Sequence, residues 1–134
     1  MAVCKNNKIL IVDDEPLNRL FLVDLLKMHN LTPIQAINGR EAIQHWLAND
    51  FFAILMDIQM PEMNGLDATR FIRQQEEGRP KTPIIAITAY GTKASQADCE
   101  QAGMNGYLTK PLSISTLLET IAPFYASPLS MIFP

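Results

Sequence analysis

Hydrophobic residues along this chain form five short runs, and each run is followed by a longer segment with helical periodicity. The clearest runs are residues 8–12 (KILIV), 51–56 (FFAILM) and 83–88 (PIIAIT), which are rich in branched apolar residues and carry almost no charge. Two weaker runs cover residues 32–36 and 106–109. Runs of this length are typical of strands buried on both faces of a parallel sheet. The pattern therefore predicts five strands.

The segments between and after the runs predict five helices, at residues 16–30, 39–48, 66–75, 93–102 and 113–121. In the first helix the apolar residues recur at helical spacing and define one apolar face: Leu17, Leu20, Phe21, Leu25 and Met28. Pro16 suits an opening turn, and Ser113 is a good N-cap for the last helix. Gly103 is expected to end the fourth helix.

Strands that alternate with helices predict an α/β fold. The expected architecture is a doubly wound five-stranded parallel sheet with five helices on its two faces and right-handed crossovers. With 134 residues the chain has the size of one domain, which we expect to cover residues 1–125. Residues 126–134 contain two prolines and are expected to be a C-terminal tail or linker stub.

Composition excludes several classes of function. The net charge is −3 and the 11 basic residues are spread along the chain, which argues against direct nucleic acid binding. Cys4 and Cys99 lack CxxC spacing, so a redox pair or metal knuckle is not indicated. The apolar runs are too short to cross a bilayer, and the first residues lack the apolar core of a signal peptide. We therefore expect a cytoplasmic protein without membrane insertion.

Polar residues stand where the predicted strands end, the edge at which doubly wound sheets bind ligands. Asp13 and Asp14 follow the first strand, and Asp57 follows the third. Thr88 ends the fourth strand, and Lys110 follows the fifth. Three neighbouring carboxylates repel one another unless a cation lies among them, and oxygen ligands suit Mg²⁺. The grouping predicts a Mg²⁺ site.

Each of these residues also has a structural explanation when taken alone. Asp13 or Asp14 can cap the following helix, and Asp57 can open a turn. Thr88 can be a simple strand former and Lys110 a solvated surface charge. Together, however, a carboxylate nucleophile, a divalent cation, a hydroxyl and a fixed ammonium are the groups that phosphoryl transfer uses, because this chemistry depends on positioning and charge stabilisation.

Four motifs make the chain resemble the receiver domains of two-component response regulators and hybrid sensor kinases. They are ILIVDDEP at 9–16, ILMDIQMPEMNG at 54–65, PIIAITAY at 83–90 and GYLTKP at 106–111. The resemblance covers about residues 7–125 and implies a flavodoxin-like receiver fold. It implies a phosphorylation switch rather than an enzyme, partnered by a sensor histidine kinase or a histidine phosphotransfer domain. The motifs look especially like those of receivers in hybrid kinases, and they do not indicate the downstream effector.

The resemblance also implies a role for each site residue. Asp57 is the implied phosphoacceptor. The implied Mg²⁺ ligands are Asp13, Asp14, Asp57 and the main-chain carbonyl of Gln59. Thr88 and Lys110 are implied to bind the phosphoryl oxygens.

Three further residues are implied to act in switching or timing. Tyr107 resembles a switch aromatic that turns inward when Thr88 moves toward the phosphoryl group, although a tyrosine at a strand end can also be a half-buried core residue. Pro111 is implied to follow Lys110 through a cis peptide bond, which only a proline makes inexpensive. Tyr90 is at a position resembling those that tune phosphoryl lifetime, and its bulk predicts slow self-dephosphorylation.

Three other functions compete with a receiver switch. A phosphatase with an aspartate nucleophile uses the same chemistry, but such enzymes carry an acid two residues after the nucleophile, where this chain has Gln59. A flavodoxin-like cofactor binder needs a phosphate-binding loop after the first strand, and the segment DDEP is acidic and lacks glycine. A degenerate receiver that only docks partners would have lost site residues, yet all of them are present.

Overall fold

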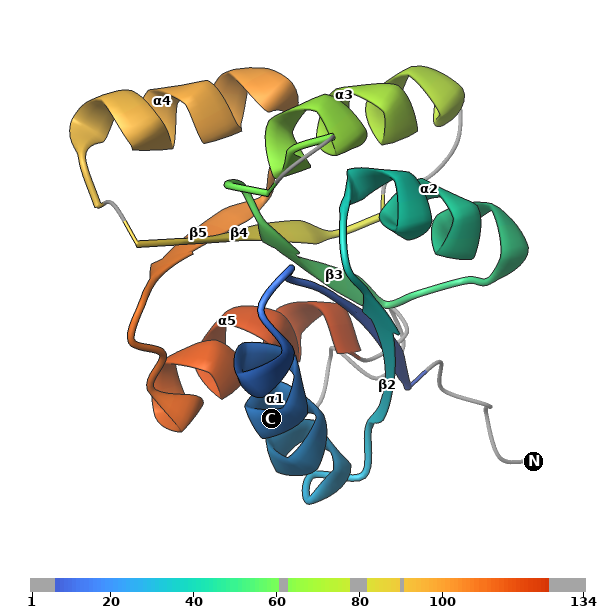
Figure 1. The fold of residues 1–134 in the computed structure, drawn as a ribbon, viewed down its shortest axis with the longest axis vertical. Helices are drawn as coiled ribbons and strands as arrows, with labels where there is room; N and C mark the ends of the chain where they lie inside the picture. The colour runs from blue at the N-terminus through green and yellow to red at the C-terminus, as the bar shows by residue number, and fades with distance from the viewer. Residues whose placement is uncertain (1–6, 61–62, 78–81, 90, 126–134) are drawn as a thin grey trace.

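The computed structural model of the protein describes residues 7–60, 63–77, 82–89 and 91–125. The strands are β1 (Lys8–Val12), β2 (Thr32–Ala36), β3 (Ala53–Asp57), β4 (Ile84–Thr88) and β5 (Gly106–Thr109). The helices are α1 (Pro16–Lys27), α2 (Gly39–Ala48), α3 (Gly65–Gln75), α4 (Lys93–Ala102) and α5 (Ile114–Tyr125). Strand and helix alternate along the whole described chain, so the predicted α/β architecture is confirmed (Figure 1).

The five strands form one parallel sheet in the order β2-β1-β3-β4-β5. The chain moves outward from β1 to β2 and then crosses to the other side of β1, so the strand order reverses between β1 and β3. In their register Val12 lies opposite Met56. The next residue of each strand, Asp13 and Asp57, therefore emerges side by side at the carboxyl edge, where such folds bind ligands.

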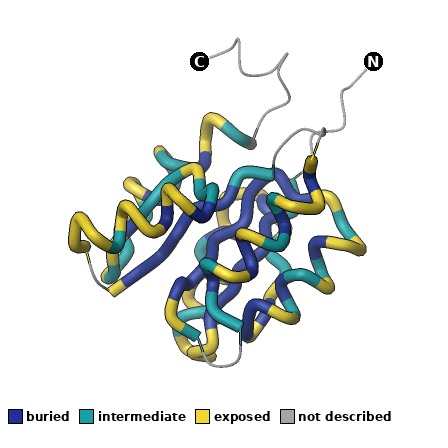
Figure 2. Tube along the Cα trace, turned by 90° about the horizontal axis from the view of Figure 1, so that it is seen from above, coloured by how far each residue is buried: buried dark blue, intermediate teal, exposed yellow. Residues whose placement is uncertain are grey.

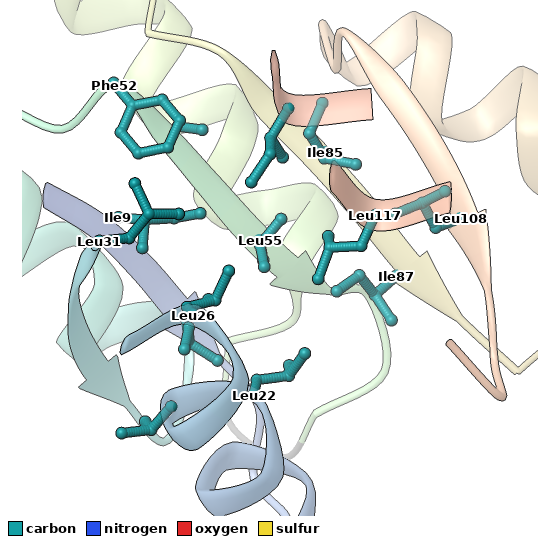
Figure 3. Close-up of a cluster of buried hydrophobic side chains, with 14 residues drawn as sticks. Ile9, Leu22, Leu26, Leu31, Phe52, Leu55, Ile85, Ile87, Leu108 and Leu117 are labelled. Carbon is teal, nitrogen blue, oxygen red and sulfur yellow. The ribbon is translucent and has the colours of Figure 1, made fainter. Parts of the chain in front are cut away.

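Two layers of helices cover the sheet, with α1 and α5 on one face and α2, α3 and α4 on the other (Figure 1). Alternate residues of each strand face opposite layers, as the pleat requires. The central strands β1, β3 and β4 are buried along nearly their whole length, whereas β2, β5 and the outer sides of the helices are more exposed (Figure 2). The cluster beneath α1 and α5 contains side chains from four strands and two helices, among them Ile9, Leu22, Leu26, Leu55, Ile85 and Leu117 (Figure 3).

Helix α1 packs on the sheet through a different face from the apolar face that the sequence predicted. Its buried residues are Leu22, Val23 and Leu26. Four apolar residues of the predicted face are instead between 54% and 78% exposed: Leu17, Leu20, Phe21 and Met28. Since α1 is apolar around most of its circumference, periodicity predicts the helix without deciding which side meets the sheet.

The predicted ends of several elements differ from the structure by a few residues. The third strand begins at Ala53 rather than Phe51, and Asp57 is its last residue rather than the residue after it. Helix α5 begins after Ser113 and continues to Tyr125, four residues beyond the predicted end. The prediction for the end of α4 is confirmed, because Gly103 follows it with φ of 101°, a left-handed conformation that glycine adopts without strain. None of the described helices is long and apolar enough to cross a membrane.

A network of hydrogen bonds around Arg73 joins α3 to the segments that lead into β4 and β5, near the amino ends of these strands. The Arg73 guanidinium donates to the carbonyl oxygens of Gly103 and Thr82, each at 2.8 Å, and to Asn105 Oδ1 at 2.7 Å. It also pairs with Glu76, at 2.6 Å. The carboxylate of Glu76 is buried and accepts a further hydrogen bond from the Thr82 amide. Each of these polar groups therefore has a hydrogen-bond partner within the network.

Replacing Arg73 by Ala is expected to lower the free energy of unfolding by about 3 kcal/mol, because it leaves the buried Glu76 carboxylate without its cation. Urea denaturation followed by circular dichroism measures the change. The matched control is Arg70→Ala, which removes an arginine that pairs with Asp67 at the same i,i+3 spacing on the exposed side of α3. That loss should stay below about 1 kcal/mol. Equal effects of the two substitutions would contradict this account of the network.

Candidate functional site

Asp57 is placed at the end of the central strand β3, with only 5% of its surface exposed. Its carboxylate accepts a hydrogen bond from the Gln59 main-chain amide, 2.9 Å from Oδ1, and one from the Lys110 ammonium, 3.1 Å from Oδ2. Burial raises the pKa of Asp57 above the ordinary aspartate value, and the charge of Asp13 adds to this, while the two hydrogen bonds oppose it. The site thus holds a carboxylate whose charge is incompletely compensated.

The acidic loop after β1 is held from several sides. Asp13 is buried, and its amide donates to the carbonyl of Ala36 at the end of β2, at 3.1 Å. Its Oδ1 accepts a hydrogen bond of 2.8 Å from the Glu15 amide, and its Oδ2 lies 3.6 Å from Lys110 Nζ. Asp14 is exposed at the mouth of the site. The Asp13 carboxylate is thus buried and restrained by hydrogen bonds, whereas Asp14 is exposed.

The three aspartates form a cluster of the kind that holds a divalent cation. One carboxylate oxygen from each of Asp13, Asp14 and Asp57 lies within 4.8 Å of the others. Three carboxylates at this separation repel one another, and hard oxygen donors match the preference of Mg²⁺. The donor set therefore fits Mg²⁺, as the sequence led us to expect. Gln59 is exposed directly beyond Asp57, and its amide is already used as a donor to that carboxylate.

Lys110 reaches two of the three carboxylates with one ammonium group. Burial by itself lowers the pKa of Lys110, but its hydrogen bonds and charge interactions with Asp57 and Asp13 outweigh burial, and the net pKa is raised. Lys110 is therefore a permanent cation in the site. The amide of Lys110 donates to the Thr88 carbonyl at 2.8 Å, which joins the ends of β4 and β5. The peptide bond from Lys110 to Pro111 is cis.

The Asn-Gly pair of the sequence lies at the end of the loop that follows Asp57, where α3 begins. Asn64 caps α3 by accepting a hydrogen bond from the Asp67 amide at 2.9 Å. Gly65 lies so close to β3 that a Cβ there would overlap the main-chain oxygen of Asp57. The adjoining Met63 carbonyl accepts a 2.9 Å hydrogen bond from Gly39 at the start of α2. Residues 63–65, the described end of the loop after Asp57, are therefore packed against main-chain atoms on two sides.

The remaining predicted residues lie around the aspartates and Lys110. Thr88 is completely buried at the end of β4. Tyr107 is half-buried on β5 and packs against a small cluster that includes Ile58 and Cys99. It also lines a cavity of about 340 Å³ between α4, β5 and α5. Tyr90 lies outside the described residues, so its predicted effect on phosphoryl lifetime stays a prediction.

One residue at the site was not predicted from the sequence. The guanidinium of Arg19, on α1, donates to the main-chain carbonyl of Asp13 at 2.7 Å and to the side chain of Gln35 on β2 at 3.2 Å. Nothing in the sequence separates Arg19 from an ordinary solvated arginine on a helix. The contact exists only because α1 turns this side toward β2.

The doubly wound sheet and the acidic cluster at its strand reversal define a class of signalling domain, and comparison with known proteins identifies the family. The family model for the response regulator receiver domain matches residues 9–122. The chain belongs to this family and is a receiver domain of two-component signalling. Receiver domains are signalling switches rather than conventional enzymes, and they bind Mg²⁺ in an acidic pocket.

Relatives of known sequence and structure agree with this assignment. The chain is 34% identical to the polar-differentiation response regulator DivK of Brucella anthropi, over 87% of this chain and 94% of DivK. The receiver domain of a sensor histidine kinase from Pseudomonas aeruginosa, with a magnesium ion coordinated in its active site cleft, superposes with a TM-score of 0.82 at 35% identity, covering 91% of this chain and 99% of that one.

A third similar structure contains a partner. It is the co-crystal structure of the Saccharomyces cerevisiae histidine phosphotransfer protein Ypd1 with the receiver domain of its downstream response regulator Ssk1. The match has a TM-score of 0.85 at 28% identity and covers 92% of each chain. In that case a receiver of this fold is bound to a histidine phosphotransfer protein.

Replacing Asp57 by Asn is expected to stabilise the protein in EDTA, and more at neutral pH than at acid pH. Because the pKa of Asp57 is raised in the folded state, its contribution to stability is present below the ordinary aspartate pKa and is lost as the pH rises through the folded-state value. Thermal denaturation of both proteins at about pH 4.5 and pH 7.5 measures the difference. A difference that is equal at both pH values would contradict the raised pKa.

Proposed function

We propose that this receiver accepts a phosphoryl group on Asp57, in a Mg²⁺-dependent reaction with a phosphohistidine donor, and that the modification switches a partner-binding surface. The observation that supports this most directly is the arrangement around Asp57. A buried carboxylate at the strand reversal lies 3.1 Å from the Lys110 ammonium and beside the two aspartates that follow β1. These are the groups that a phosphoryl acceptor needs.

In the transfer, a carboxylate oxygen of Asp57 forms a bond to phosphorus as the bond from phosphorus to the donor imidazole nitrogen breaks. Lys110 already lies within hydrogen-bond distance of Asp57, so its charge is in place before the reaction begins. A magnesium ion held by Asp13, Asp14, Asp57 and the Gln59 carbonyl would offset negative charge on the phosphoryl oxygens. The Asp57 carboxylate is itself the nucleophile, so its attack needs no general base.

The switch would act through Thr88 and Tyr107. A phosphoryl group adds about −1.5 to −2 charges and three acceptor oxygens, and it favours the conformer in which Thr88 and Lys110 close on them. Thr88 is buried at the end of β4, so its movement must repack the neighbouring side chains. Tyr107 lies on the adjacent strand and borders the cavity between α4, β5 and α5, and movement of Thr88 would free the space for Tyr107 to turn inward.

Dephosphorylation is expected to be slow. The second residue after the acceptor is Gln59, which cannot serve as the general acid and base of a phosphatase. The tyrosine at position 90 is proposed to hinder the attacking water further. The switch therefore assists its own phosphorylation and loses the phosphoryl group slowly, without turning over an external substrate. We assign this function to residues 1–125 and treat residues 126–134 as a tail or linker.

Incubation with acetyl phosphate and Mg²⁺ is expected to add one phosphoryl group to the chain, as measured by intact-protein mass. The adduct should be absent with EDTA and absent from Asp57→Asn, because one removes the cation and the other the nucleophile. It should be stable to acid and labile to base, as an acyl phosphate is. Absence of the adduct under all conditions would favour a docking module and would remove Asp57 as an active centre.

The exposed apolar face of α1 is the surface on which we place the protein phosphodonor. Helix α1 begins two residues after Asp14, so its first turns border the mouth of the acceptor site. Leu17 is 75% exposed and Phe21, one turn further, is 55% exposed. A donor that brings a phosphohistidine to Asp57 must cover the surroundings of this mouth, and side chains such as these gain most from being covered. Partner recognition would then be largely apolar.

Replacing Leu17 and Phe21 by Ala is expected to slow phosphoryl transfer from a phosphorylated histidine phosphotransfer domain at least tenfold. Transfer from acetyl phosphate should be unchanged, because the small donor needs no docking surface. Autoradiography of the two reactions provides the measurement. The matched control is Leu47→Ala, which removes a leucine that is 65% exposed on α2. If the double variant and the control transfer equally fast from the protein donor, α1 is not the docking surface.

A further inference from the structure

Arg19 makes a short side-chain hydrogen bond to the backbone of the acidic loop. It lies in the second turn of α1, and its guanidinium donates a 2.7 Å hydrogen bond to the Asp13 carbonyl. The amide of the same residue donates to the Glu15 carbonyl at 3.2 Å. Arg19 is itself anchored by the bond from its Nε to Gln35 Oε1 on β2, at 3.2 Å. Side chain and backbone of one residue thus hold both ends of the acidic loop.

The carbonyl that Arg19 binds belongs to the peptide unit that joins Asp13 to Asp14. Because a peptide unit is planar, fixing its oxygen fixes the direction in which the chain enters Asp14. The carboxylate of Asp13 has other restraints, from the Glu15 amide and Lys110. Asp14 is exposed, and Glu15, which precedes α1, makes no side-chain cap on that helix. The direction of the Asp14 carboxylate therefore depends on this peptide unit.

We propose that Arg19 is a positioning residue for the Mg²⁺ site, which holds the Asp13–Asp14 peptide unit so that both carboxylates face the same cation. This inference rests on the proposed function, because it concerns the metal site on which phosphoryl acceptance depends. Arg19 touches neither the phosphoryl group nor the reacting atoms. It acts through the backbone of the two aspartates.

Charge and positioning predict opposite results when Arg19 is replaced. A guanidinium near a cation site repels the cation, so its removal should tighten Mg²⁺ binding if charge were the whole effect. Loss of the hydrogen bond frees the peptide unit and should weaken Mg²⁺ binding, since residues that orient metal ligands typically contribute about 10- to 100-fold to metal affinity. The sign of the change therefore separates the two explanations.

The test is isothermal titration calorimetry with Mg²⁺ on the full chain, for the native protein, Arg19→Gln, Arg19→Lys and Gln35→Ala. We expect Arg19→Gln to weaken Mg²⁺ binding about tenfold. Arg19→Lys and Gln35→Ala should weaken it less, because the first keeps one donor and the second removes only the support of the guanidinium. Arg70→Gln, which removes an exposed arginine from α3, should leave it unchanged.

Phosphorylation kinetics give a second measurement. With acetyl phosphate, Arg19→Gln should need about tenfold more Mg²⁺ for half-maximal rate but reach the native rate at saturating Mg²⁺, since the nucleophile and Lys110 are intact. Thermal denaturation in EDTA identifies any variant that does not fold. If Arg19→Gln does not fold, the Mg²⁺ affinities of Arg19→Lys and Gln35→Ala test the inference in its place.

Unchanged or tighter Mg²⁺ binding by folded Arg19→Gln overturns the inference while leaving the proposed function in place. Absence of Mg²⁺ binding by the native chain overturns both. Weaker binding by Arg19→Gln, with native affinity in Arg70→Gln, supports the positioning role.

Discussion

The arrangement of this protein depends on the adjacency of β1 and β3, the two strands between which the strand order reverses. Their register brings Asp13 and Asp57 out of the sheet side by side, with Asp14 next to them. Three carboxylates in one place cost free energy, and Lys110 from the end of β5 offsets part of that cost. The remaining negative charge, carried on carboxylate oxygens, suits a divalent cation. Strand order, rather than any single loop, thus creates the chemistry.

The loops at the carboxyl ends of the strands and those at the amino ends are restrained in different ways. At the carboxyl ends of the strands the loops are held by hydrogen bonds from Arg19 to the Asp13 carbonyl and from Gly39 to the Met63 carbonyl, and both bonds use main-chain oxygens rather than carboxylates. Near the amino ends Arg73 and Glu76 close a fully satisfied network beneath β4. A site whose charge is incompletely compensated is thereby built on a frame whose other end is strongly restrained.

The helices likewise combine residues buried against the sheet with residues exposed on the surface. α1 buries Leu22, Val23 and Leu26 against the sheet and leaves Leu17 and Phe21 exposed to solvent on the helix that follows the aspartates. α4 buries only Cys99 and Ala102, both in its last turns. The N-terminal half of α4, next to the segment that follows Thr88, has few contacts to lose. The described surfaces best suited to change or to bind a partner are thus those next to Asp57.

The sequence by itself determined the order of strands and helices and the residues at the strand ends, because continuous apolar runs, helical periodicity and residues such as Gly103 act locally. It also predicted the grouping of the aspartates with Lys110, since parallel strands present their carboxyl ends at one edge. Only the tertiary structure decided which face of α1 is buried, because Leu17 and Leu22 are equally apolar and packing alone chooses between them. It likewise placed Arg19 on the Asp13 carbonyl, a contact that depends on the rotation of α1 over β2 and leaves no mark in the local sequence.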